Sequence, residues 1–199
     1  MRLALYGGVG SGKSAALGYL KKAYGAVVIG TDQVVHDLYR PGEPGEKVIR
    51  SLLGDGVLSP DGTLDRAKMA AVLYEDAELL REVGKRIHPL AWAESEKRMT
   101  EAENAGAKLV VLETALPSGE KKYLFDEIWY IYASKEIRAG RLKRDRGYSD
   151  ERIRDIMAKQ LSDEAYEALS DFILVNEGTP EALYEAIDRR LSGRAEKIV

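Results

Sequence analysis

The segment Gly7–Ser14 constrains the fold of this chain more than any other stretch. It reads Gly-Gly-Val-Gly-Ser-Gly-Lys-Ser and matches the pattern G-x-x-x-x-G-K-[ST], between a short apolar run at residues 3–6 and a helical pattern of apolar side chains. Glycines let backbone N–H groups turn toward a polyphosphate, and the N-terminus of the following helix adds partial positive charge. An ordinary glycine-rich turn would not require the Lys-Ser pair. The segment therefore predicts a nucleoside triphosphate site.

Individual roles follow from this phosphate loop, the name used below for Gly7–Ser14. Lys13 is expected to reach the β- and γ-phosphates, and the Ser14 hydroxyl is expected to ligate Mg²⁺. The residues of this region predicted to contact the nucleotide are Gly8, Val9, Gly10, Ser11, Gly12, Lys13, Ser14 and Ala15.

Apolar runs of strand length recur along the chain and predict an α/β fold. Most are apolar at successive positions, which is typical of strands buried on both faces of a parallel sheet. Helical patterns separate them, as in βαβ crossovers. We therefore predict a doubly wound, five-stranded parallel sheet with strands at residues 2–6, 27–29, 109–112, 128–132 and 172–175.

Two segments are interpreted as insertions in a core made of residues 1–31, 106–134 and 161–199. Residues 32–105 are expected to form several helices, with Pro89 kinking or dividing the pattern between residues 76 and 104. Residues 135–160 carry nine basic and five acidic side chains, a local net charge of +4. They could form a solvated helical face. Because arginine forks match phosphate oxygens, we favour a lid that clamps phosphate.

Acidic residues at strand ends are candidates for chemistry, since ligands of open α/β sheets bind beyond the carboxyl ends of the strands. Asp32 follows the second predicted strand and could accept a proton from an attacking hydroxyl or orient it. A helix N-cap is an equally good local interpretation of Asp32. Glu113 closes the third strand and resembles an acid that holds Mg²⁺ directly or through water. Asp126 begins a strand and is excluded because it faces the opposite end.

The composition of the chain limits the kinds of partner and site that it can have. A net charge of −3 and a pI near 5.6 argue against general nucleic-acid binding. The absence of cysteine removes disulfides, thiolate metal sites and cysteine nucleophiles. No apolar run approaches the ~20 residues that span a bilayer, and a cytoplasmic protein without a membrane partner is expected. The two histidines, His36 and His88, have structural roles on local sequence alone.

With these residues in view, the chain resembles the dephospho-CoA kinase family over nearly its whole length. The order and spacing of several segments carry the resemblance: Gly7–Ser14, Thr31–Tyr39 with Pro41-Gly42, Asp61–Arg66, Ile87–Leu90, Arg141–Arg144 with Gln160, and Asp171–Asn176. The resemblance implies ATP-dependent phosphorylation of the ribose 3′-hydroxyl of dephospho-CoA, with ATP and Mg²⁺ as cofactors. A monomer is expected, although the sequence does not specify the oligomeric state.

The resemblance also assigns roles to residues. Asp32 matches the catalytic acid of the family, and Lys13 and Arg144 complete the implied catalytic set. Arg144 matches a lid arginine near the ATP phosphates, and Asn176 matches a contact near the purine. Arg66 and His88 match the region that binds the acceptor substrate.

Departures from the family pattern leave two alternatives open. Gly30 stands where the first acid of an Asp-x-Asp pair is usual, and residues 114–120 replace the usual Pro-Leu-Leu-x-Glu. Ala15 stands where serine or threonine is usual, and Tyr6 stands where threonine is usual. The altered residues 114–120 favour a divergent kinase acting on another nucleotide or small hydroxyl acceptor. Gly30 favours a nucleotide-binding regulatory module without transfer activity.

Overall fold

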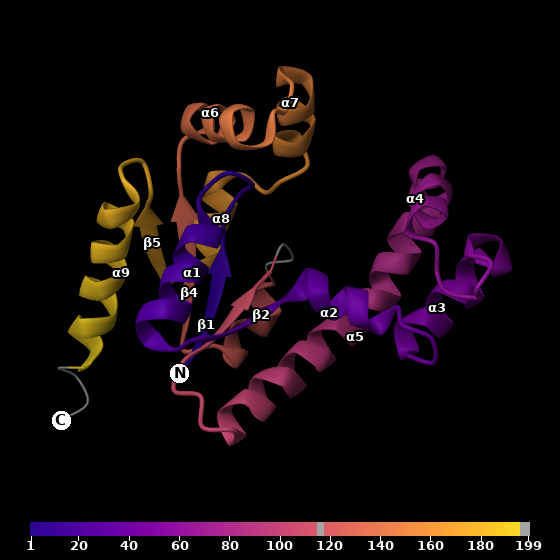
Figure 1. Ribbon diagram of the computed structural model, residues 1–199, viewed down its shortest axis with the longest axis horizontal. Coiled ribbons are helices and arrows are strands. Elements are labelled where there is room, and N and C mark those ends of the chain that lie inside the picture. The colour runs from indigo at the N-terminus through magenta and orange to yellow at the C-terminus, as the bar shows by residue number, and fades with distance from the viewer. Residues whose placement is uncertain (115–117, 196–199) are drawn as a thin grey trace. The chain divides into compact units, whose positions relative to one another are not determined.

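The computed structural model describes residues 1–114 and 118–195, and the chain divides into two compact units (Figure 1). The first unit comprises Met1–Val28 and Ala102–Val199, and the second comprises Ile29–Glu101. The altered stretch at residues 114–120 lies partly outside the described residues, because 115–117 are not among them.

Five strands of the described residues form one parallel sheet in the order β2-β3-β1-β4-β5. The phosphate loop follows the central strand, β1, whose Leu5 pairs with Glu113 of β3 and with Trp129 of β4. The sheet confirms the predicted fold, and each predicted strand is found within one residue of its predicted ends. The bounds are β1 Arg2–Tyr6, β2 Val27–Gly30, β3 Val110–Glu113, β4 Glu127–Tyr132 and β5 Phe172–Val175.

Helices cover both faces of this sheet because successive strand residues point to opposite sides. Leu3 and Leu5 pack with α1 (Lys13–Tyr24) and α9 (Pro180–Ala195), which lie side by side (Figure 1). Ala4 and Tyr6 face the other side and pack with Tyr166 of α8 (Asp163–Leu169). Continuous apolar runs are therefore required here, as the sequence predicted.

The basic segment after β4 forms two short helices, α6 (Lys135–Arg146) and α7 (Asp150–Ala158). Gly147 ends α6 in the left-handed conformation, with φ of 63°. The Ser149 hydroxyl accepts a hydrogen bond from the backbone N–H of Arg152 at 3.2 Å and so caps α7. A further 3₁₀ turn, η2, spans Gly119–Leu124.

The second unit is helical and has its own apolar core. It contains α2 (Thr31–Leu38), α3 (Pro44–Leu53), the 3₁₀ turn η1 (Asp55–Val57), α4 (Arg66–Glu75) and most of α5 (Ala77–Asn104). The side chains buried at its centre are Ile49, Val57, Met69, Val83 and Ile87.

Pro89 does not divide the long helix, so that part of the prediction is wrong. Residues 77–104 form one helix of 28 residues with Pro89 inside it. Proline removes one backbone donor and leaves the carbonyl of Lys85 without its helical partner. Both residues are exposed, so water can satisfy that carbonyl. Despite the length of α5, no helix in the described part of the chain is apolar enough to span a membrane.

Candidate active site

Two glycines of the phosphate loop leave space for side chains from other elements, and one of them also requires a glycine backbone. Gly12 has φ of 103°, in the left-handed region, and a Cβ there would collide with Nδ2 of Asn176. A Cβ at Gly8 would collide with the guanidinium of Arg138. The loop is therefore closely surrounded by side chains from elsewhere in the first unit.

Lys13, the first residue of α1, folds back over the loop. Its Nζ donates to the carbonyl oxygens of Gly7 at 2.7 Å and Gly8 at 3.3 Å. Ser14 follows in the first turn of α1 and is exposed. The ammonium group and the helix N-terminus thus lie at the same end of the loop, where they favour an anion.

Asn176 ties the end of β5 to the loop. Its side chain donates from Nδ2 to the carbonyl oxygen of Ser11 at 2.7 Å, and its backbone N–H bonds to Tyr132 at 2.8 Å. The residue is 5% exposed. Asn176 therefore connects the loop with the carboxyl end of the sheet.

Two arginines of α6 contact the loop, and they are not the one that the family resemblance selected. Arg138 donates from Nε to the Val9 carbonyl at 3.0 Å. Arg141 donates from Nη1 to the carbonyls of Gly10 and Ser11 at 3.3 Å each, and from Nη2 to that of Asn176 at 3.0 Å. A sequence signal existed: Arg138 lies three and four residues before Arg141 and Leu142, and so shares their helix face.

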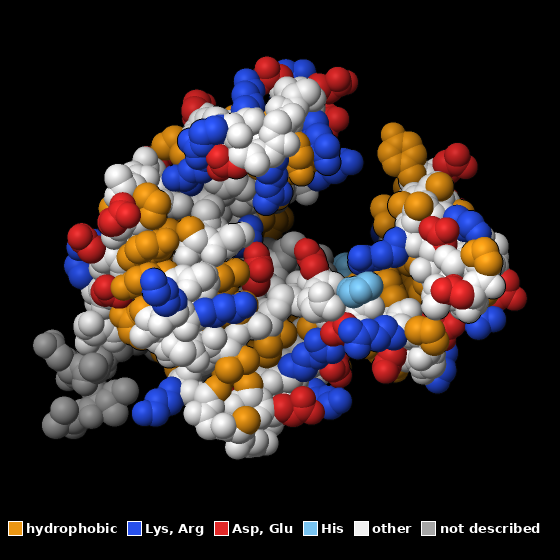
Figure 2. All heavy atoms as spheres, viewed as in Figure 1, with side chains coloured by type: hydrophobic (Ala, Val, Ile, Leu, Met, Phe, Trp, Pro, Cys, Tyr) orange, Lys and Arg blue, Asp and Glu red, His pale blue; other side chains and the backbone are white. Residues whose placement is uncertain are grey.

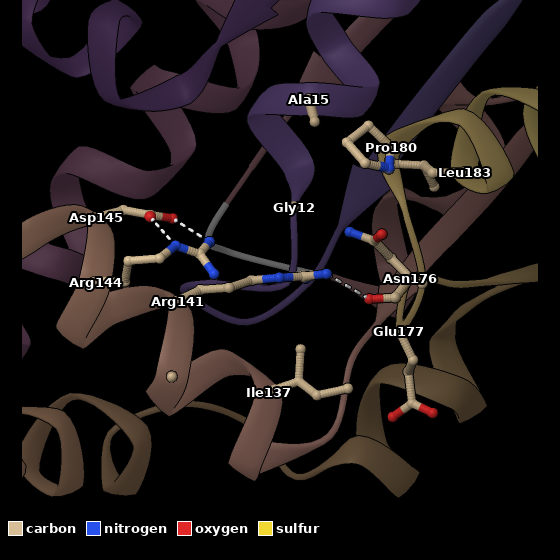
Figure 3. Close-up of a pocket in the computed structure, with 12 residues that line it drawn as sticks. Gly12, Ala15, Ile137, Arg141, Arg144, Asp145, Asn176, Glu177, Pro180 and Leu183 are labelled. Atoms are coloured by element: carbon tan, nitrogen blue, oxygen red, sulfur yellow. Dashed lines mark hydrogen bonds and ion pairs between the residues drawn. The ribbon is translucent and has the colours of Figure 1, made fainter.

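Arg144 instead pairs with its neighbour Asp145, with Nε and Oδ1 2.7 Å apart. Figure 3 shows this pair on one side of a cavity and Arg141 reaching toward Asn176. The hydrogen bond from Arg144 holds the pKa of Asp145 below its ordinary value. Arg144 can still turn toward a ligand, because the pair is exposed and such pairs are weak.

The cavity beside the loop has a volume of about 660 Å³ and is lined by residues of three helices, α1, α6 and α9, and of the loops before α1 and after β5. It brings together four residues that the sequence assigned to the nucleotide: Gly12, Ala15, Arg144 and Asn176. Its size suits a small-molecule ligand. The remaining lining residues are Ile137, Gly140, Arg141, Asp145, Glu177, Gly178, Pro180 and Leu183.

Positive charge gathers over α6 and α7, where Figure 2 shows blue and red side chains intermixed. Part of this charge is balanced locally. Lys143 lies 2.5 Å from the carboxylate of Asp150, and their hydrogen bond lowers the pKa of that aspartate. The remaining net positive charge of residues 135–160 can attract an anionic ligand.

The predicted acceptor residues lie on separate helices of the second unit. Asp32 is exposed in the first turn of α2, whose N-cap is Gly30 and has no side-chain capping bond. The N-cap interpretation of Asp32 is therefore wrong, and no residue among 29–101 forms a hydrogen bond or ion pair with its carboxylate. Arg66 begins α4 and lies near Tyr39. Burial raises the pKa of Tyr39, and the positive charge of Arg66 offsets part of that rise. His88 is exposed on α5, one turn after Gly84.

Comparison with known proteins identifies the family. The family described as "Dephospho-CoA kinase" matches residues 1–181. The dephospho-CoA kinase of Corynebacterium glutamicum is 34% identical over 187 residues, covering 92% of each chain. This chain belongs to the dephospho-CoA kinase family. The predicted family is confirmed, and with it the predicted enzyme class, an ATP-using kinase.

Solved structures agree with this fold. A protein of Thermus thermophilus, TT1252, has a TM-score of 0.77 at 24% identity and covers 97% of each chain. The dephospho-CoA kinase from Campylobacter jejuni has a TM-score of 0.64 at 18% identity and covers 96% of each chain. At these identities the likeness supports the architecture alone.

The residues of this family member fit the cofactors of such a kinase. The Ser11 hydroxyl in the loop is buried, 1% exposed for the residue, and has no hydrogen-bond partner in the described chain. Ser14 and Glu113 offer a hydroxyl and a carboxylate, oxygen ligands that Mg²⁺ prefers. No cluster of three His, Cys, Asp or Glu among the described residues could hold a metal.

Proposed function

We propose that this chain transfers the γ-phosphate of ATP to the ribose 3′-hydroxyl of dephospho-CoA, giving CoA and ADP in the last step of CoA biosynthesis. The observation that carries the proposal is the intact phosphate loop beside a cavity lined by Gly12, Arg141 and Asn176. A cradle of amides with adjacent cations can hold a triphosphate and stabilise its charge during transfer.

The family resemblance assigns the roles within the first unit in this proposal. Lys13 and Arg144 would neutralise the phosphates, and Asn176 would contact the purine. Ser14 and Glu113 would hold Mg²⁺, which supplies further charge neutralisation when bound. The helices α6 and α7, within residues 135–160, would act as the lid that excludes water from the phosphates.

The acceptor belongs to residues 32–105 in this proposal. Arg66 and His88 would bind it, and Asp32 would orient the 3′-hydroxyl and accept its proton. Support comes from the free, exposed carboxylate of Asp32 at the start of α2. A carboxylate with no partner in its own unit is available to a substrate.

Replacing Asp32 tests the catalytic assignment. Asp32→Asn keeps the shape of the side chain but removes its charge and basicity, and we expect kcat to fall by about 100-fold or more. Its ATP affinity should change by less than about twofold, as for a surface substitution. Glu75→Gln, an exposed acid at the end of α4, serves as the control and should keep wild-type turnover. Near-wild-type turnover of Asp32→Asn would remove Asp32 from the mechanism.

The acceptor itself is tested by substrate comparison. Transfer from ATP should favour dephospho-CoA over adenosine, AMP and CMP. No preference for dephospho-CoA would support the divergent kinase suggested by residues 114–120. ATP binding without acceptor-dependent ADP release would support the regulatory module suggested by Gly30. The cytoplasmic location and the lack of a nucleic-acid partner stay predictions. The monomeric state is also a prediction, and light scattering can measure it.

A further inference from the structure

Arg138 is a buried cation without an anionic partner. The residue is 4% exposed, and it forms no salt bridge with any of residues 1–114 or 118–195. Its hydrogen bonds go to neutral acceptors: the Val9 carbonyl, 3.0 Å from Nε, and Oε1 of Gln160, which accepts from Nη2. Burying an uncompensated charge is costly. Such a residue is expected where an anionic ligand completes the site.

Arg138 and Lys13 donate hydrogen bonds to neighbouring residues of the loop. Lys13 donates to the carbonyls of Gly7 and Gly8, and Arg138 donates to that of the next residue, Val9. The Arg138 guanidinium also lies against Gly8, where it would collide with a Cβ. Lys13 and Arg138 therefore donate hydrogen bonds to three consecutive residues of the phosphate loop. Because Lys13 is proposed to contact the β- and γ-phosphates, we expect the charge of Arg138 to lie near the same groups.

One oxygen atom joins Arg138 to a backbone donor of the loop. Oε1 of Gln160 accepts a hydrogen bond from the backbone N–H of Val9 at 3.3 Å and another from Nη2 of Arg138. A loop amide together with a guanidinium N–H is the donor pair that recognises a phosphate oxygen. A phosphate oxygen is charged and accepts these bonds more strongly than a neutral amide oxygen.

Arg138 also has donors to spare. A guanidinium carries five N–H donors, and two of them are used in the bonds to Val9 and Gln160. Nη1 has no partner in the described chain and is not among the polar atoms sealed from solvent. The unused N–H donors can bind a ligand oxygen while Nε keeps its bond to the loop.

We propose that Nη2 of Arg138 and the N–H of Val9 form a binding site for an oxygen of the terminal phosphates. That oxygen replaces Oε1 of Gln160 when the nucleotide binds. The inference rests on the proposed use of ATP and adds a phosphate-binding residue to it. A purely structural Arg138 would only hold α6 against the loop and would affect all ligands of the cavity alike.

Calorimetric titration with ATP, AMP and inorganic tripolyphosphate separates the two roles. Arg138→Met removes the charge while filling a similar space, and we expect it to weaken ATP and tripolyphosphate about tenfold to 100-fold. AMP affinity should change by less than about twofold, because AMP has no terminal phosphates. Equal losses for ATP and AMP, or no loss for either, would overturn the proposal. Arg189→Met, at an exposed site on α9, is the control for loss of one positive charge.

Gln160→Ala provides a second arm that keeps Arg138 in place. Since the displaced oxygen is gone, tripolyphosphate should bind as tightly as to the wild type or more tightly. A tenfold loss would show that Gln160 is not displaced, and it decides the matter if Arg138→Met does not fold. A wild type that binds no ATP would refute the proposed function itself. A wild type that binds ATP no better than Arg138→Met refutes only the role of Arg138.

Discussion

Close packing around the phosphate loop makes single side chains decisive there. Gly12 adopts φ of 103° and leaves no room for a Cβ beside Nδ2 of Asn176. Asn176 in turn holds the Ser11 carbonyl at 2.7 Å. A side chain at Gly12 would therefore strain the backbone and push away the residue that joins β5 to the loop.

Gly12→Ala should lower both stability and nucleotide affinity. We expect about 1–3 kcal/mol less free energy of unfolding from the strained backbone, and at least about tenfold weaker ATP binding. The matched control is Gly18→Ala in α1, where a Cβ meets nothing within 4 Å. That change should stabilise the protein by about 0.5–1 kcal/mol, because alanine is the better helix former. Urea unfolding and ATP titration measure both, and equal behaviour of the two variants would contradict the prediction.

The sequence could identify the phosphate loop because its spacing is local, but not which arginines of the basic segment contact it. Arg138 reaches Val9 across 129 positions of sequence, and only the way that α6 follows β4 brings the two together. The resemblance favoured Arg144, which the structure places on the cavity wall but pairs with Asp145. Local motifs predict backbone sites, whereas distant contacts depend on the packed fold.

The strands were predictable at the scale of elements because burial on both faces leaves continuous apolar runs. The continuity of α5 was not predictable, since a local rule for Pro89 cannot include the exposure of Lys85. The pairing of α1 with α9 was equally hidden. It depends on Tyr19, which stacks on Tyr184 with ring centroids 4.2 Å apart and donates to Asp188 at 2.7 Å.

Contact between α1 and α9 should weaken at high pH. The Tyr24 hydroxyl donates to Asp188 at 2.7 Å, and burial together with this bond raises the pKa of Tyr24 to about 12. The hydrogen bond to Asp188 also raises the pKa of Tyr19. Unfolded tyrosines lose their protons near pH 10. The resulting stability is therefore complete below pH ~10 and is lost as pH rises through about 12.

Tyr24→Phe should flatten this dependence, because the variant has one fewer hydroxyl whose proton the fold retains. The measurement is the free energy of unfolding in urea at several pH values between neutral and pH ~12. Tyr74→Phe, at an exposed tyrosine of α4, is the control and should follow the wild type. Parallel curves for wild type and Tyr24→Phe would show that Tyr24 is not linked to stability.

At the scale of the whole molecule, the two compact units correspond to two proposed binding functions, one for the nucleotide and one for the acceptor. Every contact with the phosphate loop described above comes from the first unit, and every predicted acceptor residue lies in Ile29–Glu101. The second unit has its own core around Ile49 and Val83. We therefore expect a ligand that binds one unit to stabilise mainly that unit. Hydrogen exchange can detect this, because it measures local unfolding.

Hydrogen exchange should distinguish the two ligands by unit. A non-hydrolysable ATP analogue should slow exchange in the phosphate loop, in α6 and near Asn176, because the ligand holds those backbone groups closed. CoA, the proposed product with its 3′-phosphate, should slow exchange mainly in α2, α4 and α5. These helices contain Asp32, Arg66 and His88. The control is Arg66→Ala, which should reduce protection by CoA and leave protection by the ATP analogue unchanged. If CoA instead protected only residues of the first unit, the acceptor would bind beside the nucleotide cavity and residues 32–105 would lose their proposed role.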